Sequence, residues 1–508
     1  MTVANAKHTL GADHVPMLSG GKWVSSHSGR LGDVYNPSTG RIIARVPLCD
    51  SQETAAVVEA AAAAGIEWGM TPVVERARVM FRFRELLVRD FEAIAELITR
   101  EHGKTLAESR AEVQRGLEMV EFACGIPSLM MGDNLGNVAG DVDAETVRHP
   151  VGVCVGITPY NFPVMVPLWM LPVAVTCGNA FILKPSDKVP LSAVRLGELL
   201  IEAGIPDGVF SIVHGDRECV ETLLTHPKVA AISFVGSTPI AQYVYQTGTT
   251  AGKRVQAAGG AKNHLVVMPD ADLDQTVRAL AASAFGCSGQ RCMAGSIAVA
   301  VGAAGDDAVK ELVQYAAKLR VGPTDANEQV DVGPLIRADH RDRVASYLDI
   351  AQREGAQVVL DGRQAVQSPG FLLGPSVVDQ VSPNMRVARE EIFGPMLAVI
   401  RADNLDDVIK LGQQCEYGNG ASIFTRSGYA ARQFKQHFNA GMIGINVGVP
   451  APMAWFPFTG WNRSFFGDLH IQGTEGIQFY TRQKVTLTRW PQPHDSHLDP
   501  VWRTSAAK

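Results

Sequence analysis

The residue with the clearest chemical potential is Cys292, one of eight cysteines in the chain. It directly follows Arg291 in a glycine-rich segment of short side chains, between a predicted helix and a predicted strand. A neighbouring cation favours the thiolate form of cysteine, which attacks carbonyl carbons. Most cysteines are only small buried apolar residues, and we expect this of Cys287, which we place on a helix face. The pattern predicts covalent catalysis by Cys292.

Neither disulfides nor a metal site is expected. The eight cysteines are scattered singly, without a CxxC pair and without histidines at a spacing suited to zinc. Free thiols indicate a reducing compartment.

Asn161 is the candidate for stabilising the oxyanion that forms when a thiolate adds to a carbonyl. It lies between Tyr160 and Phe162, in a stretch from 149 to 183 that contains no Asp, Glu, Lys or Arg. One good donor at such an oxygen is worth about 3 kcal/mol of transition-state stabilisation. The alternative is a turn asparagine that bonds only to its own backbone.

A nucleotide phosphate site is indicated by the FVGST segment at 234–238. The predicted strand ends at Val235, Gly236 allows close approach of the backbone, and Ser237 begins a helix whose N-terminus attracts anions. The segment is a weak signal on its own, because Gly-Ser is common at such turns. No G-x-G-x-x-G follows any predicted strand, so the usual dinucleotide fingerprint is absent.

These residues must be positioned by alternating strands and helices. Short apolar runs from Met17 to Pro47 predict hairpins, and a long helical region follows, its first helix opened by a capping box of Asp50 and Glu53. After Val151, apolar runs alternate with amphipathic stretches, which is typical of a parallel, doubly wound sheet. A second such series starts near residue 258. The alternating stretch GIQFYTRQKVTLTRW near the end stands apart from both and could extend the sheet edge of another subunit.

Length and composition exclude several classes of protein. A chain of 508 residues needs more than one core. With a net charge of −6 and no run of Lys and Arg, a nucleic-acid partner is not expected. Prolines and Gly178 interrupt the chargeless stretch, so we predict a buried strand, a turn and a buried helix there, and no membrane span. The first residues lack a signal-peptide core, so we expect a cytoplasmic protein.

Three motif clusters together resemble the aldehyde dehydrogenase superfamily over nearly the whole chain. They are TPYNFP (158–163) with LKPSD (183–187), FVGST (234–238), and GQRC (289–292) with EEIFGP (390–395). More narrowly, GQRCM, QAAGGAKNH, NVGVPAPMAWFPFTGW and FFGDLH look like the CoA-acylating branch that acts on methylmalonate semialdehyde. The resemblance implies an α/β, aldehyde dehydrogenase-like fold with two doubly wound domains and a small β element for oligomerisation, and a homo-oligomer arranged as a dimer of dimers. The implied division is a tail at 1–16, an NAD-binding domain at 17–130 and 148–257, a catalytic domain at 258–450, and oligomerisation strands at 131–147 and 475–495.

The resemblance also implies a role for individual residues. Asn161 would act on the oxyanion together with the backbone N–H of Cys292, and Arg115 and Arg291 would hold a substrate carboxylate. The residues that it assigns to NAD are Thr158, Phe162, Lys184, Asp187, Gly236, Ser237, Glu391 and Phe393. Asp187 would accept from the adenine-side ribose and repel a 2′-phosphate, which favours NAD over NADP. Solvated helix or surface charges remain the alternatives for Arg115 and Glu391.

A missing residue separates the branches of the superfamily. Hydrolytic relatives carry a Glu four positions before the Lys of an E-x-G-G-K segment, and counting back from Lys262 gives Ala258. No Glu occurs between Glu221 and Glu311. Without a general base, attack by water is slow, and the resemblance names coenzyme A as the acceptor. We therefore expect NAD-dependent oxidation of methylmalonate or malonate semialdehyde with decarboxylation. The alternatives are a hydrolytic aldehyde dehydrogenase and a non-catalytic NAD-binding protein.

Overall fold

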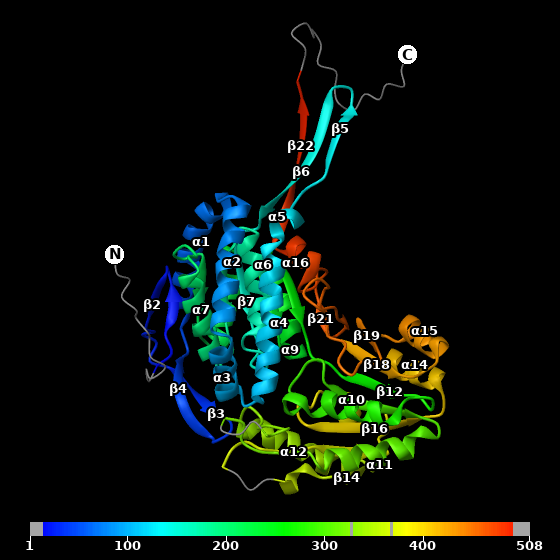
Figure 1. The fold of residues 1–508 in the computed structure, drawn as a ribbon. Coiled ribbons are helices and arrows are strands. Elements are labelled where there is room, and N and C mark those ends of the chain that lie inside the picture. Colours follow the sequence, from blue (N-terminus) through cyan, green and yellow to red (C-terminus); the bar gives the residue numbers. More distant parts are fainter. Residues whose placement is uncertain (1–13, 326–328, 366–368, 491–508) are drawn as a thin grey trace, which may run out of the picture.

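Two large β-sheets covered by helices, and a small sheet that projects away from them, make up the fold (Figure 1). The computed structural model describes residues 14–325, 329–365 and 369–490. Besides these three sheets it contains a ribbon of β3 (Leu31–Asn36) and β4 (Arg41–Pro47) and the short pair β17 (Tyr417–Gly418) and β20 (Trp461–Asn462).

The first large sheet has eight strands in the order β2-β1-β9-β8-β7-β10-β11-β21. Its five central strands are parallel, while both edges are antiparallel. The strands are β1 (Met17–Ser19), β2 (Lys22–Val24), β7 (Val153–Ile157), β8 (Ala180–Lys184), β9 (Phe210–Ile212), β10 (Val229–Val235), β11 (Arg254–Ala258) and β21 (Phe465–Phe466). The helices that accompany it are α1 (Ser51–Met70), α2 (Val73–Arg89), α3 (Phe91–His102), α4 (Leu106–Cys124), α5 (Ile126–Leu129), α6 (Met165–Thr176), α7 (Leu191–Glu202), α8 (Arg217–Thr225), α9 (Thr238–Thr250) and α16 (Gly473–Phe479).

Alternating side chains of the central strands fill two separate cores. In β7, Val153, Val155 and Ile157 pack against α1, α8 and α9, whereas Cys154 packs on the opposite face against α2, α4 and α6. Burying one such aliphatic side chain stabilises the fold by about 2 kcal/mol. A sheet buried on both faces is typical of doubly wound proteins, as the sequence predicts.

Local signals in the sequence explain where the helices begin. The predicted capping box at α1 is present, with Asp50 accepting from Glu53 N and Glu53 reaching back to the N-cap backbone. The chargeless stretch forms β7, the 12-residue helix α6 and β8, as predicted. In the described residues we find no helix whose length and hydropathy would suit a membrane span.

The second large sheet has seven strands in the order β14-β15-β16-β13-β12-β18-β19, parallel except for β14. The strands are β12 (Asn263–Val267), β13 (Gly295–Val301), β14 (Gln357–Leu360), β15 (Ser376–Asp379), β16 (Met396–Ala402), β18 (Gly420–Phe424) and β19 (Met442–Ile445). The helices are α10 (Leu273–Phe285), α11 (Ala304–Ala316), α12 (Ala338–Arg353), α13 (Arg386–Arg389), α14 (Leu405–Gln414) and α15 (Gly428–His437), with 3-10 turns η1 (Gly286–Gly289) and η2 (Gly362–Ala365). This sheet too is buried on both faces, by α12, α14 and α15 on one and by α10 and α11 on the other.

The small sheet joins β5 (Asn134–Ala139), β6 (Val142–Pro150) and β22 (Thr481–Arg489), and it extends away from both large sheets (Figure 1). The prediction of a strand from residue 475 is wrong for its first residues, which form the end of α16, and only β22 pairs with β6 of its own chain, in a continuous antiparallel register of nine residue pairs. Both outer strands of the sheet expose apolar side chains, among them Leu135, Val485 and Leu487, at 60%, 66% and 58% of their surface.

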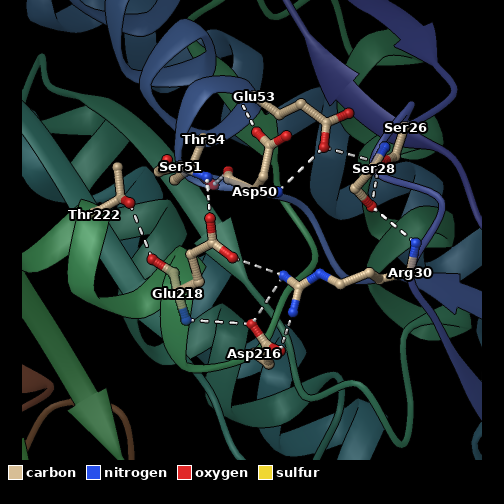
Figure 2. A network of polar contacts seen from close by, with 10 residues as sticks. All are labelled: Ser26, Ser28, Arg30, Asp50, Ser51, Glu53, Thr54, Asp216, Glu218 and Thr222. Carbon is tan, nitrogen blue, oxygen red and sulfur yellow. Dashed lines mark hydrogen bonds and ion pairs between the residues drawn. The ribbon is translucent and has the colours of Figure 1, made fainter.

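A polar network connects the segment before β3 to the N-termini of α1 and α8, two helices that accompany the first sheet (Figure 2). Arg30 donates to Asp216 at 2.9 Å and to Glu218 at 3.0 Å, while Glu218 also accepts from Ser51 N at 3.0 Å. Glu53 accepts from Ser26 Oγ at 2.9 Å. Because the Arg30 pairs are exposed they contribute little energy, but they hold α8, which supplies Val220 to the larger cavity described next.

Candidate active site

Cys292 lies where two cavities meet. The larger has a volume of about 970 Å³ and the smaller about 180 Å³, and Cys292 and Phe162 line both. All the residues predicted for catalysis and for NAD line the larger cavity: Thr158, Asn161, Phe162, Lys184, Asp187, Gly236, Ser237, Cys292, Glu391 and Phe393. Arg115 and Arg291 line the smaller one. The fold therefore gathers all twelve predicted site residues around one thiol.

The nucleophile follows a tightly wound turn. After α10 the chain passes through η1, in which Cys287, Ser288 and Gly289 have φ values of 49°, 53° and 68°. Cys287 is therefore not on a helix face as expected; it lies in a left-handed turn, with its N–H donating to Glu108 Oε1 at 2.5 Å. Only glycine fits at 289, where a Cβ atom would lie 2.0 Å from Gly394 O. Such strained backbone persists only where surrounding contacts hold it.

Two asparagines that no sequence pattern singles out bind the backbone of Cys292. Asn263 Nδ2 donates to the Cys292 carbonyl at 2.7 Å, and Asn419 Nδ2 donates to it at 3.0 Å. Asn263 lies within the QAAGGAKNH segment, but nothing in its local pattern indicates a partner 29 residues away. These contacts orient the peptide that carries the thiol.

Asn161 lies in the loop between β7 and α6 and is 4% exposed. Its Nδ2 donates to Gln290 O at 3.0 Å, two residues before the nucleophile, and not to its own turn. An amide nitrogen carries two hydrogens, so the second can donate to an oxygen bound beside Cys292. The geometry suits an oxyanion donor.

The cofactor cleft opens at the N-terminus of α9. Ser237 is the N-cap, as predicted, yet its side chain makes no capping hydrogen bond, so the first amides of the helix are available to an anion. A Cβ atom at Gly236 would lie 2.5 Å from the Phe234 ring, which restricts this position to glycine. The cleft therefore fits a dinucleotide phosphate without a G-x-G-x-x-G segment.

At the other end of the cleft, Lys184 ends β8, and Asp187 follows it. Asp187 Oδ2 lies 3.7 Å from Arg337 Nη2, so the carboxylate is held loosely and partly exposed at 38%. This placement suits an acceptor for a ribose hydroxyl.

Glu391 and Phe393 form the side of the larger cavity that faces Asn161. Glu391 Oε1 accepts from Ala261 N at 2.9 Å. Burial raises the pKa of Glu391 to about 7. Phe393 has a left-handed φ of 60° and packs edge-on against Tyr160 with ring centroids 5.9 Å apart. Glu391 is thus no solvated surface carboxylate.

Burial raises the pKa of the Cys292 thiol to about 12, and the charge of Glu391 acts in the same direction. The backbone amides of Met293 and Cys292 oppose the rise, and Arg291 does so least. The Arg291 guanidinium turns away to donate to the carbonyls of Ala282 and Ser283. The cation that the sequence suggests as thiolate stabiliser is therefore a minor influence on the pKa of Cys292.

Replacing Glu391 with Gln should speed alkylation of Cys292 by iodoacetamide. Above about pH 7 the wild-type carboxylate is ionised and raises the pKa of the thiol. Its removal lowers that pKa, and the rate near pH 8 should rise about three- to tenfold. Near about pH 6, where Glu391 is already protonated in the wild type, the two proteins should react alike. Mass spectrometry of the labelled peptide assigns the thiol, and equal rates across this pH range would contradict the coupling.

Arg115 projects from α4 into the smaller cavity. Its guanidinium donates to Glu118 Oε2 at 2.9 Å and to Pro452 O at 2.7 Å, and its side chain is 28% exposed. The residue is therefore neither a free helix-surface charge nor fully neutralised. Arg115 and Arg291 both line this cavity, as does Cys292.

Ala258, which replaces the general base of hydrolytic relatives, ends β11 and is 3% exposed. The carboxylates that line the smaller cavity are Glu108, Glu112 and Glu118. Each accepts hydrogen bonds: Glu108 from Cys287 N, Glu112 from Val164 N and Met165 N, and Glu118 from Arg115.

The chain is similar to known proteins of one family. The pattern of the aldehyde dehydrogenase family matches residues 23–486. Malonate-semialdehyde dehydrogenase 2 of Geobacillus kaustophilus (strain HTA426) is 49% identical over 484 residues, covering 95% of this chain and 100% of the relative.

Two solved structures are also similar. The structure of methylmalonate-semialdehyde dehydrogenase from Oceanimonas doudoroffii superimposes with a TM-score of 0.92 at 47% identity, over 94% of this chain and 99% of that one. A chain from Sinorhizobium meliloti 1021 in complex with NAD, assigned as a methylmalonate-semialdehyde dehydrogenase, gives a TM-score of 0.93 at 44% identity, over 94% and 98%.

Proposed function

Because the chain belongs to the aldehyde dehydrogenase family, we propose that it oxidises malonate semialdehyde or methylmalonate semialdehyde with NAD and passes the acyl group to coenzyme A. The observation that carries this proposal is the position of Cys292, which lines both the larger cavity, where the predicted NAD residues lie, and the smaller cavity, which Arg115 and Arg291 line. Relatives 49% identical are named malonate-semialdehyde dehydrogenases, which supports the substrate class.

The chemistry begins with the thiol. The Cys292 thiolate adds to the aldehyde carbon, a C–S bond forms, and the carbonyl π electrons move to oxygen, where the Asn161 amide and the Cys292 N–H stabilise the alkoxide. NAD, when bound in the larger cavity, supplies the acceptor for the hydride that leaves the former aldehyde carbon. Loss of this hydride leaves a thioester on Cys292. Carboxylate recognition by Arg115 and Arg291 fixes the far end of the substrate.

The same donors serve the next step. A malonyl-type thioester loses carbon dioxide when its C–C bond breaks, because the electron pair passes into an enolate whose oxygen the oxyanion donors stabilise. Protonation of the carbanion gives the propionyl or acetyl thioester. The thiolate of CoA then attacks this thioester and releases Cys292.

Coenzyme A replaces water as acceptor because the cavity offers water no dedicated base at position 258. Measuring NADH formation with and without CoA tests the proposal. Turnover that is equally fast in both cases, with the free acid as product, would favour a hydrolytic aldehyde dehydrogenase.

The remaining expectations belong to the same proposal. The first large sheet and its helices, at 17–130 and 148–257, form the NAD-binding domain, and 258–450 form the catalytic domain. The projecting sheet, with its exposed apolar side chains on β5 and β22, serves a homo-oligomer in the cytoplasm, arranged as a dimer of dimers. Of the predicted tail at 1–16, residues 1–13 lie outside the described residues, as do residues 491–495 of the predicted oligomerisation strands.

Arg115→Leu should lower kcat/KM for malonate semialdehyde about 10- to 100-fold, the scale of one charge-assisted pair. Propanal lacks the carboxylate, so its kcat/KM should change less than about threefold. Arg110→Leu is the matched control, since Arg110 lies on the same helix in an exposed pair with Glu92 at 2.9 Å. An equal loss for both aldehydes would instead assign Arg115 a structural role.

A further inference from the structure

An ion pair without any solvent exposure lies behind the catalytic loop. Lys104 Nζ is 2.6 Å from Glu112 Oε2, and both side chains are 0% exposed. Lys104 lies just before α4, and Glu112 lies two turns into that helix. Neither residue takes part in the chemistry proposed above.

The pair grips both ends of the segment that carries Asn161. Lys104 Nζ donates to Asn161 O at 2.6 Å and lies 4.1 Å from the centre of the Phe162 ring. Glu112 Oε1 accepts from Val164 N at 2.8 Å and from Met165 N at 3.1 Å. The loop from 161 to 165 is thus tied by its backbone at three points to one pair of charges.

A gain in the stability of the fold does not by itself explain a buried ion pair at this position. Taking two charges out of water carries a desolvation penalty, and well-packed apolar side chains of similar volume often stabilise a core equally well. What charges add is a fixed geometry. An oxyanion donor displaced by about 1 Å loses much of its effect on the rate.

We propose that the Lys104–Glu112 pair positions the Asn161 amide toward the oxyanion beside Cys292. Lys104 lines neither cavity, and Glu112, at the wall of the smaller one, has its Oε1 bonded to Val164 N and Met165 N, so the pair acts through the backbone of the Asn161 loop. This inference rests on the proposed function, in which Asn161 is the oxyanion donor. Helix α4 then positions both the nucleophile and the oxyanion donor. Glu108 accepts from the Cys287 turn that precedes Cys292, and Glu112 accepts from the loop that carries Asn161.

The test compares Lys104→Met with the charge-balanced double variant Lys104→Met/Glu112→Gln. The double variant keeps an oxygen acceptor for Val164 N and Met165 N and leaves no unpaired buried charge, so it should fold even if the single variant does not. In the folded variants the single-turnover rate of NADH formation should fall about 10- to 100-fold, within the loss caused by removing one oxyanion donor. The dissociation constant of NAD and the alkylation rate of Cys292 should stay within about twofold of wild type, because neither residue lines the cofactor cleft and the Glu112→Gln change keeps the size of the side chain at the wall of the smaller cavity.

Glu101→Gln is the matched control for loss of a buried carboxylate. Glu101 is also 0% exposed and accepts from Leu191 N at 2.8 Å and Ser192 N at 2.9 Å, at the start of α7. It should alter thermal stability while leaving the single-turnover rate unchanged. An equal rate loss in this control would show that general loosening of the core explains the effect.

A double-mutant cycle with Asn161→Ala decides whether the pair acts through Asn161. Once the amide is gone, adding the Lys104→Met/Glu112→Gln changes should cost less than about threefold in the single-turnover rate. A second, full loss of rate would overturn the positioning role, as would a folded double variant with a wild-type rate. If Asn161→Ala itself retains the wild-type rate, the oxyanion assignment in the proposed function is at fault, and the positioning role falls with it.

Discussion

Replacing Cys292 with Ala should abolish NADH formation while NAD still binds. In the proposed function the thiol forms the covalent bond to the substrate, whereas the residues assigned to the cofactor, such as Lys184, Ser237 and Glu391, are other residues of the larger cavity. The expected loss in kcat is about 10⁴-fold or more, the scale seen when an enzyme loses its nucleophile. Fluorescence titration of the variant with NADH, alongside the activity assay, separates the two effects.

Cys287→Ala is the matched control, because Cys287 lines the smaller cavity together with Cys292. Burial raises the pKa of Cys287 to about 12 as well, so the pKa does not distinguish the two thiols. Position does, since Cys292 alone of the two lines both cavities. A trapped acyl group found on Cys287 by mass spectrometry would show that Cys287, and not Cys292, is the nucleophile.

Without coenzyme A, the wild-type enzyme should give a burst of NADH followed by slow turnover. The burst corresponds to acylation of Cys292, and its size should approach the number of competent sites. Deacylation by water lacks the help of a positioned base, which is worth about 10²- to 10⁴-fold. Adding CoA should raise the steady-state rate by a factor in that range, as measured by NADH absorbance after rapid mixing.

The product distinguishes the two routes of release. Propionyl-CoA or acetyl-CoA should form when CoA is present, and chromatography of the quenched reaction identifies it. Fast release of the free acid without CoA would show that water is activated by another group. Glu391 would then be the first residue to examine, because its pKa of about 7 would let it accept a proton near neutral pH.

Elements with strong local signals could be predicted from the sequence. The capping box at Asp50 fixes the start of α1, and β10 ends at Val235 with Ser237 as the N-cap of α9, as expected. The chargeless stretch forms β7, α6 and β8, with Pro159, Pro163 and Gly178 in the connections between them, whereas Pro172 lies inside α6.

Other elements carry too little local signal. The strands β11, β12 and β15 are only four or five residues long, and β11 and β12 flank the GGAK segment, whose glycines conceal them. The left-handed turn at Cys287 depends on Glu108, which is 179 residues away in the sequence. Asn263, Asn419, Lys104 and Glu112 were missed for the same reason: their roles exist only once distant segments meet, and spacing along the chain does not show such contacts.

The pairing of β6 with β22 joins residues that lie far apart, since Arg148 and Thr481 are separated by 333 positions. During synthesis one edge of β6, the central strand of the small sheet, therefore stays unpaired until nearly the whole chain has left the ribosome. Contacts of such long range slow folding, and an open strand edge invites pairing with other chains. A ribosome that stalls before residue 481 would leave a nascent chain in which β6 can pair with β5 but keeps its other edge open to strands of other chains.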